Sequence, residues 1–251
     1  MHEKIWLKHY PDNIPAEVKY DLYPNLNTFI RETIKEYGDR VAFISMDKGL
    51  TYNQLDKYAD QFAAYMSSLG MKPGDKIALM MPNILQYPIA LFGAIRAGFV
   101  VVNTNPLYTP REMKLQFQDA GVKAIVIAEN FAYNLQQIIG ETEIKHVVTA
   151  SIGEMLGGLK GPLVNFVIRK IKKMVPAFSL PGAVSFSKAL SQGAGKPVPH
   201  HDSRREDTVI FQYTGGTTGI AKGAMLTNEN LLANLEQVKA IFLSQLRKNE
   251  E

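Results

Sequence analysis

The sequence predicts an α/β fold in which helices flank a mainly parallel sheet. Short apolar runs recur along the N-terminal part of the chain, and each is followed by a longer stretch with apolar residues at helical spacing. Gly and Pro mark many of the junctions between these segments. Strands that alternate with helices of this length are typical of a parallel sheet covered by helices. With 251 residues, the chain can bury the substantial core that such a fold requires.

The expected elements follow one another in a regular order. The expected strands are Val41–Ser45, Lys76–Met81, Phe99–Asn103, Ala124–Ala128, His146–Thr149 and Thr208–Tyr213. The expected helices are Tyr52–Leu69, Asn83–Ala97, Pro110–Ala120, Phe131–Ile139 and Leu226–Leu235. Thr109 can cap the helix from Pro110, because Glu112 lies three residues after the cap. Asp75 is expected to close the Lys72–Asp75 turn, and Thr227 or Asn228 to cap the last helix.

The regular pattern breaks at residues 151–205, which are expected to form an insertion or connector. Their Gly and Pro residues predict loops, and Ser191–Pro199 predicts a flexible connection. One stretch, Leu163–Val175, has the pattern of an amphipathic helix. Its apolar face would comprise Leu163, Val164, Val167, Ile168, Ile171, Met174 and Val175, and its basic side Arg169, Lys170, Lys172 and Lys173.

Two interpretations of this basic helix stay open. It can pack on the core with its basic side in solvent, as an ordinary surface helix. Alternatively, it can lie on an anionic membrane surface, where each Lys or Arg contributes about 1 kcal/mol of attraction. The apolar face would then give reversible attachment.

Composition excludes several classes of protein. The chain has no Cys, so disulfides and thiol chemistry are excluded. Five of the 28 basic residues lie between Lys160 and Lys173, which contains no acid, and the other 23 nearly balance the 24 acidic residues. The net charge of +4 is therefore local and does not indicate nucleic-acid binding. The pair His200-His201 is not expected to form a metal site, because adjacent His side chains do not easily converge on one ion.

The most informative segment follows the strand Thr208–Tyr213. A loop rich in Gly and Thr, with one Lys, lies between this strand and the last helix. Glycines let backbone N–H groups bend toward an anion, hydroxyls donate or bind Mg²⁺, and a Lys adds positive charge for outer phosphates. The segment is therefore expected to bind a nucleoside triphosphate with Mg²⁺ through Tyr213, Thr214, Gly215, Gly216, Thr217, Thr218, Gly219, Ile220, Ala221, Lys222, Gly223 and Ala224. A plain turn is the alternative.

The loop is not of the Walker A type, because Gly223 follows Lys222 where that motif has Ser or Thr. Its order, Tyr-Thr-Gly-Gly-Thr-Thr-Gly-x-x-Lys-Gly, closely resembles the phosphate loop of the adenylate-forming (AMP-binding) superfamily. Gly216 and Ala221, where many members have Ser and Pro, are similar to bacterial long-chain fatty-acid–CoA ligases. Three further segments resemble that family's N-terminal landmarks, in the family's order: Gly74–Asn83, Ala90–Gly98 and Val102–Glu112.

The resemblance implies an incomplete N-terminal domain of the adenylate-forming fold. Residues 1–251 would be the N-terminal part of the AMP-binding domain, and the family's later base-, ribose- and acyl-binding motifs and C-terminal domain are not found after Ala224. The complete enzyme would use ATP, Mg²⁺, a long-chain fatty acid of unspecified length and coenzyme A, through an acyl-adenylate. We expect no catalytic residue within this chain, which alone would form no acyl-CoA and bind ATP weakly.

The alternative is a truncated, non-catalytic membrane-surface or interaction module. An independent NTPase is disfavoured, because the chain has no Walker A Lys. A missing half would leave strand edges unpaired, and pairing of such edges between two copies would form a homodimer, which is a further alternative. The N-terminus does not have the pattern of a signal peptide, which suits a cytoplasmic protein. The resemblance further implies peripheral attachment to the inner face of the cytoplasmic membrane.

Overall fold

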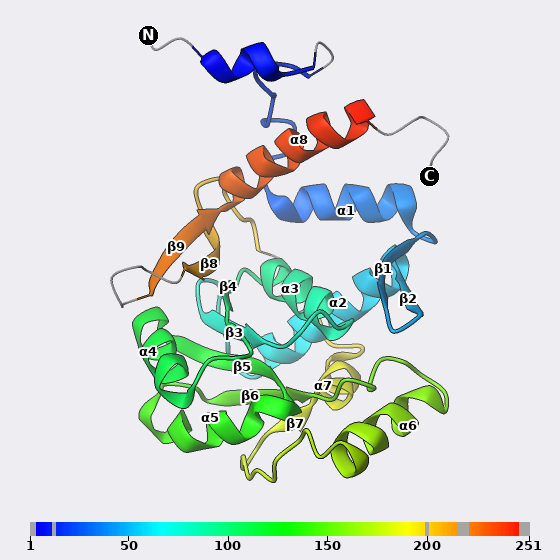
Figure 1. Cartoon of the computed structure of the whole chain (residues 1–251), viewed down its shortest axis with the longest axis vertical. Coiled ribbons are helices and arrows are strands. Elements are labelled where there is room, and N and C mark those ends of the chain that lie inside the picture. The colour runs from blue at the N-terminus through cyan, green and yellow to red at the C-terminus, as the bar shows by residue number, and fades with distance from the viewer. Residues whose placement is uncertain (1–3, 12–13, 199–200, 215–220, 246–251) are drawn as a thin grey trace.

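A computed structural model describes residues 4–11, 14–198, 201–214 and 221–245, with side chains as far as Phe242. Figure 1 shows a sheet covered by helices, with α1 and α8 above it. The strands are β1 (Val41–Ser45), β2 (Lys48–Thr51), β3 (Lys76–Met80), β4 (Val100–Asn103), β5 (Val122–Ala128), β6 (His146–Ala150), β7 (Val184–Ser185), β8 (Thr208–Thr214) and β9 (Lys222–Thr227). The α-helices are α1 (Leu26–Tyr37), α2 (Tyr52–Ser68), α3 (Gln86–Arg96), α4 (Pro110–Ala120), α5 (Ala132–Ile138), α6 (Lys160–Phe166), α7 (Phe186–Gly193) and α8 (Asn228–Gln245).

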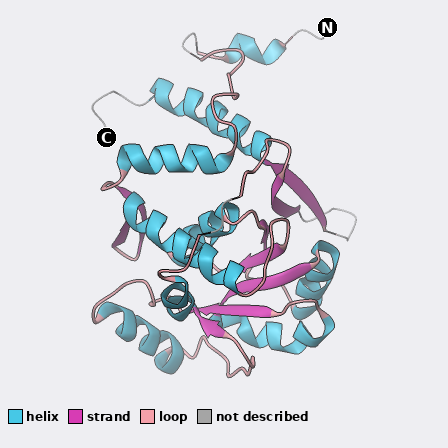
Figure 2. Cartoon of the chain, turned by 180° about the vertical axis from the view of Figure 1, so that it is seen from behind, coloured by secondary structure: helices cyan, strands magenta, loops and turns pink. Residues whose placement is uncertain are grey.

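The main sheet has the order β7-β6-β5-β3-β4-β8-β9, and its strands pair in parallel except β9, which is antiparallel to β8. Along β3, Ile77 and Leu79 pack in one core with α2, α3 and α7, whereas Ala78 and Met80 pack in another with α4 and α5. This alternation places helices on both faces of the sheet, as Figure 2 shows from behind. The predicted α/β class is confirmed.

Local signals in the sequence fix two helix starts. Thr109 accepts from the backbone N–H of Glu112, whose carboxylate accepts in return from the N–H of Thr109. Thr51 forms the same capping box with Gln54 at the start of α2. The predicted Thr109 cap is therefore confirmed. Gly121 ends α4 with φ 64°, a left-handed conformation that favours Gly.

Several elements were not expected. Helix α1 is capped by Asn25 and packs through Ile30 and Ile34 against α3 and α8. Strand β2 forms a hairpin with β1 through Met46 and Asp47, both with positive φ. Such a turn favours Gly, Asn or Asp, and only Asp47 fits that preference, so the turn signal is weak.

Residues 151–205, expected to form an insertion or connector with a basic amphipathic helix, also contribute a strand to the main sheet. They contain α6, the short strand β7 and α7, and Phe186 of α7 is fully buried. The predicted helix Leu163–Val175 also differs. Helix α6 begins at Lys160 and continues as a π-helical stretch, Val167–Ile171, and Lys173 beyond it has φ 50°. The regular 3.6-residue face therefore does not extend to Val175.

Candidate functional site

The predicted phosphate loop connects β8 to β9 as a hairpin at the edge of the main sheet (Figure 1). Six of the predicted loop residues lie outside the described residues: Gly215, Gly216, Thr217, Thr218, Gly219 and Ile220. The two strands that flank the loop are described. In their register, Thr214 pairs with Lys222 and Tyr213 pairs with Gly223.

The expected strand–loop–helix order is wrong in one respect. Strand β9 stands between the loop and α8, so Lys222, Gly223 and Ala224 belong to a strand. Small residues and Gly are weak strand formers, and pairing with β8 decides the conformation here. The expected cap of α8 is confirmed at Thr227, whose hydroxyl accepts from the N–H of Asn230 at 3.2 Å.

Tyr213 is a buried residue at the base of the loop. Its side chain packs in the core between the sheet, α4 and α5, and its hydroxyl donates to the carboxylate of Asp119 on α4. Burial, together with the nearby Asp119 carboxylate, raises the pKa of Tyr213 above its usual value. A Cβ on Gly223 would lie 2.9 Å from the Tyr213 ring, so Gly223 leaves the space that the ring occupies.

Thr214 and Lys222 differ from Tyr213, because both are exposed. They face each other across the two strands, and side chains of directly opposite residues lie on the same face of an antiparallel pair. A Thr side chain and a Lys side chain therefore leave the same face of the hairpin where the loop begins and ends. Ala221 is half-buried and contacts the same core as Tyr213.

The loop begins at the carboxyl end of the parallel strand β8, where open α/β sheets bind ligands. Polar side chains from neighbouring elements meet at this edge. The Tyr87 hydroxyl donates to Asn103 Oδ1 at 2.8 Å, and Asn103 Nδ2 donates to Gln212 Oε1 at 3.0 Å. The buried Gln116 donates to the backbone oxygen of Asn103 at 2.9 Å. The strand exit at Asn103 is thus tied to β8, two residues before the loop.

Two basic residues of the segment from Leu159 to Met174, here called the basic segment, form ion pairs with the rest of the protein. Arg169 donates through Nε to Glu129 Oε1 at 2.9 Å and through Nη2 to Glu129 Oε2 at 2.5 Å. The Glu129 side chain is almost fully buried after β5. Lys160 donates to the backbone oxygen of Met46 and lies 3.3 Å from Asp47. These two cations hold the segment on the protein.

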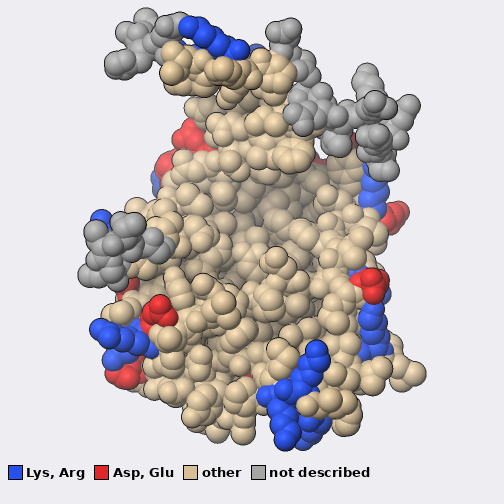
Figure 3. Space-filling view, viewed as in Figure 1, with Lys and Arg blue, Asp and Glu red and all other residues tan. Residues whose placement is uncertain are grey.

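Lys170, Lys172 and Lys173 have no ion-pair partner among the residues that the structure describes, and all three are exposed. Large apolar side chains of the same segment are also exposed: Leu159, Leu163, Phe166, Ile171 and Met174. Figure 3 shows a group of basic residues near α6, at the lower edge of the view. None of the described helices has the length and apolarity that a membrane span needs.

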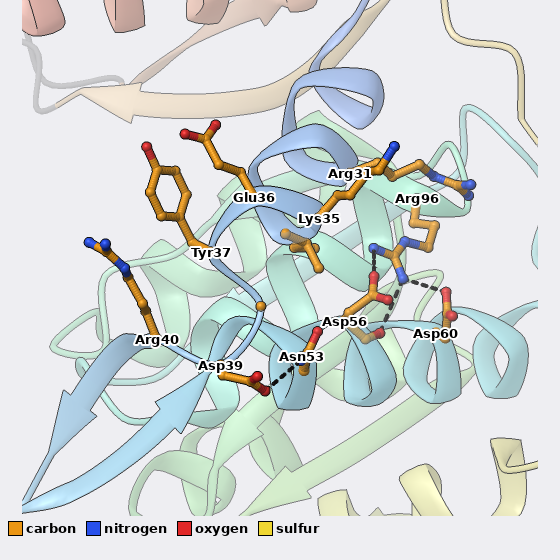
Figure 4. A pocket seen from close by; sticks show the side chains of 12 residues that line it. Arg31, Lys35, Glu36, Tyr37, Asp39, Arg40, Asn53, Asp56, Asp60 and Arg96 are labelled. Carbon is orange, nitrogen blue, oxygen red and sulfur yellow. Dashed lines mark hydrogen bonds and ion pairs between the residues drawn. The ribbon is translucent and has the colours of Figure 1, made fainter.

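A cavity of about 830 Å³ is lined by residues of α1, α2 and α3 and of the segment that follows α1, and it lies apart from the β8–β9 stem (Figures 1 and 4). Arg96 is 4% exposed, and its guanidinium donates to Asp56 Oδ1 at 2.7 Å and to Asp60. Its charge is therefore satisfied within the protein, and it holds α3 against α2. The remaining charged lining residues, Arg31, Lys35, Glu36, Asp39 and Arg40, are of both signs. This arrangement favours no particular ligand charge.

His201, the described member of the His pair, packs against backbone. A Cβ on Gly98, which has φ 76°, would lie 2.5 Å from His201 Cδ2. Within the described part of the chain, no three His, Cys, Asp or Glu side chains are placed to share a metal ion.

The chain matches a known enzyme family over most of its length. A model of the family described as AMP-binding enzyme matches residues 30–249. The chain belongs to the AMP-binding enzyme family. Within this family, it is 47% identical over 250 residues to the long-chain-fatty-acid–CoA ligase of Escherichia coli O157:H7, which covers 99% of this chain and 45% of the relative. It is 31% identical over 242 residues to the ligase of the same name from Bacillus subtilis strain 168. The chain spans less than half the length of these curated relatives.

Solved structures of AMP-binding enzymes have the same fold. A long-chain-fatty-acid-CoA ligase from Archaeoglobus fulgidus superposes with a TM-score of 0.70 at 21% identity, covering 92% of this chain and 42% of that chain. An anthranilate CoA ligase solved with anthranoyl-AMP gives a TM-score of 0.67 at 20% identity, covering 84% of this chain and 36% of that chain.

Three residues of this member of the AMP-binding enzyme family were missed from the sequence: Asp119, Glu129 and Arg96. Each forms contacts with residues distant in sequence, so no local pattern marks it. A weak signal existed for Asp119, since an acid in the last turn of a helix opposes the helix dipole and needs a compensating partner.

Proposed function

We propose that this chain is the N-terminal portion of a long-chain fatty-acid–CoA ligase, in which the segment Tyr213–Ala224 binds the phosphates of ATP. The support is the loop's place at the carboxyl end of β8, with Thr214 and Lys222 exposed side by side at its base. Relatives of that name, at 47% identity over 99% of the chain, support the substrate class.

In the proposed reaction, a fatty carboxylate oxygen attacks the α-phosphorus of ATP, and pyrophosphate leaves. The thiol of coenzyme A then attacks the acyl carbonyl of the adenylate, and AMP leaves with formation of the thioester. No base is needed for the first step, because the carboxylate is already ionised at neutral pH. The difficulty is negative charge on the phosphates, which Lys222 and backbone N–H groups of the loop would offset.

Magnesium suits the donor groups of this site. Hydroxyl and phosphate oxygens are ligands that Mg²⁺ accepts, and Thr214 presents its hydroxyl at the base of the loop. Thr217 and Thr218, which lie outside the described residues, would add two more hydroxyl groups as possible ligands. When bound with ATP, Mg²⁺ would neutralise charge on the phosphate oxygens. Thr214 and Lys222 would orient those phosphates.

Binding of MgATP tests this assignment directly on the chain. Phosphorus NMR of ATP detects weak binding through line broadening, and we expect the chain to broaden the β- and γ-phosphate lines. Lys222→Ala should reduce the broadening, because it removes the ammonium group at the loop. Lys239→Ala, a change of equal charge on α8, should leave it unaltered. Equal broadening by both variants, or none by the unmodified chain, would contradict the loop's role.

The chain alone should form no acyl-CoA from ATP, palmitate and coenzyme A. It matches only about 45% of the length of its ligase relatives, and the expected groups for base, ribose and acyl chain are not found in it. Thioester formed by the purified chain would show this inference to be wrong. The alternative, a non-catalytic interaction module, requires that its function survive Lys222→Ala and Thr217→Ala.

A second proposal concerns the exposed part of the basic segment, from Leu159 to Met174. Three lysines without ion-pair partners among the described residues stand among exposed apolar side chains, which suits the surface of an anionic membrane. We therefore propose peripheral attachment through Lys170, Lys172 and Lys173, with Arg169 acting by holding the segment on Glu129. In the complete ligase this face would meet the cytoplasmic leaflet.

Sedimentation with vesicles tests the membrane proposal. We expect binding to vesicles that contain phosphatidylserine at low salt, and little to neutral vesicles. Changing Lys170, Lys172 and Lys173 together to Gln should abolish most of the binding, since each contributes about 1 kcal/mol. The control changes Lys35, Lys57 and Lys239 to Gln, which removes the same charge elsewhere. If both triple variants bind alike, the proposal is wrong.

A further inference from the structure

The last two residues of β8 lie beyond the pairing of this strand with β4. The parallel ladder between β4 and β8 ends at the pair Asn103–Gln212. Tyr213 and Thr214 continue beyond it and, among the described residues, pair only with β9, an edge strand of the sheet with three exposed and three half-buried residues. Backbone pairing with the interior of the sheet therefore stops two residues before the loop.

Side chains hold β8 at this point. On one face, the Asn103 amide donates to Gln212, the last paired residue. On the other face, Tyr213, the first residue beyond the ladder, donates to Asp119 from the last turn of α4. Tyr213 is 8% exposed, and its ring passes over the Cα of Gly223, its partner on β9. The Tyr213–Asp119 bond thus ties both strands of the hairpin to α4.

The position of Asp119 in α4 is unfavourable for a negative charge. It lies in the last turn of α4, whose helix dipole disfavours a negative charge. Hydrogen bonds to charged groups are among the stronger ones in proteins, so the Tyr213 hydroxyl offsets that cost. We propose that Asp119 is a positioning residue for the phosphate loop. Asp119 holds the Tyr213 side chain in place, and Tyr213 in turn sets the position of Thr214 and Lys222 at the sheet edge. The consequence for ATP rests on the function proposed above, whereas the effect on β8 does not.

Hydrogen exchange of the intact chain tests the proposal without ATP. Asp119→Ala and Tyr213→Phe should each speed amide exchange at the carboxyl end of β8 by about tenfold, the effect of losing one hydrogen bond to a charged group. Asp119→Asn keeps an acceptor oxygen and should exchange nearly as the unmodified chain does. Glu112→Ala is the matched control, because it removes the capping box at the other end of α4 without touching β8.

The two readouts separate the inference from the proposed function. Asp119→Ala should also weaken the broadening of MgATP lines, whereas Glu112→Ala should not. If Asp119→Ala leaves exchange in β8 unchanged, or if Glu112→Ala speeds it equally, Asp119 does not position the loop. If the unmodified chain broadens no MgATP lines while Asp119→Ala still speeds exchange in β8, the positioning of the stem stands and the nucleotide assignment fails.

Discussion

Contacts of single residues were predictable only where they are local. The Thr109 cap and the Asp75 turn each join residues three positions apart, and both are confirmed: Asp75 Oδ2 accepts from the N–H of Lys72 at 2.8 Å. Asp119 and Tyr213 are 94 positions apart, and the fold alone brings them together. Sequence patterns therefore predicted the loop but not the bond between Tyr213 and Asp119 at its base.

Asp75 gives a prediction for pH. Burial would raise the pKa of its carboxyl group, but hydrogen bonds from the Lys123 ammonium group at 2.6 Å and from the Lys72 amide outweigh burial and leave the pKa below its usual value. A lowered pKa in the folded state contributes stability that is present above the unfolded pKa and is lost as the pH falls through the folded pKa.

We therefore expect Asp75→Asn to lower the free energy of unfolding by about 1 kcal/mol at pH 6.5. Asn keeps an acceptor for the Lys72 amide but has no charge for Lys123. The difference from the unmodified chain should be smaller at pH 3, because the carboxyl group of the unfolded chain, with an ordinary pKa of about 3.9, is mostly protonated there and its protonation favours unfolding. Urea unfolding followed by circular dichroism at the two pH values measures it. An unchanged difference at pH 3 would show that the Asp75 charge does not contribute.

Many whole elements were predicted from their periodicity, whereas α1 was missed despite its amphipathic pattern and its Asn25 cap. Strands β3 to β6 and helices α2 to α5 follow the hydrophobic pattern to within a few residues. Strand β9 was missed because Gly and Ala at its start are typical of a loop, and only its pairing with β8 makes it a strand. Helix α7 was missed within a region rich in Gly, yet it packs closely on α2.

The packing of α7 on α2 depends on Gly193. A Cβ at this position would lie 1.9 Å from the backbone oxygen of Gln61 in α2, a clash that no side-chain movement relieves. We expect Gly193→Ala to lower the free energy of unfolding by about 3 kcal/mol, the upper part of the usual range for overpacking. Gly140→Ala is the control, since nothing lies within 4 Å of its Cβ. Chemical unfolding of both variants should separate them clearly, and equal stabilities would contradict this packing.

At the scale of the molecule, the chain forms a parallel sheet with helices on both faces, and the loop begins at the carboxyl end of one strand. The α/β class followed from alternating elements, and the family from several motifs in order. The basic segment was located in the sequence, but its π-helical stretch and the bond from Arg169 to Glu129, 40 positions away, were not predictable from periodicity.

We propose that this chain supplies the phosphate-binding part of a fatty-acid–CoA ligase. The most direct test replaces the corresponding segment of the Escherichia coli O157:H7 ligase with this chain, and measures palmitoyl-CoA formed from ATP, palmitate and coenzyme A. We predict an active chimera whose kcat/KM falls by about 100-fold or more with Lys222→Ala, the scale for loss of one group that stabilises transition-state charge. A folded chimera without activity, or one that Lys222→Ala leaves fully active, would contradict the claim.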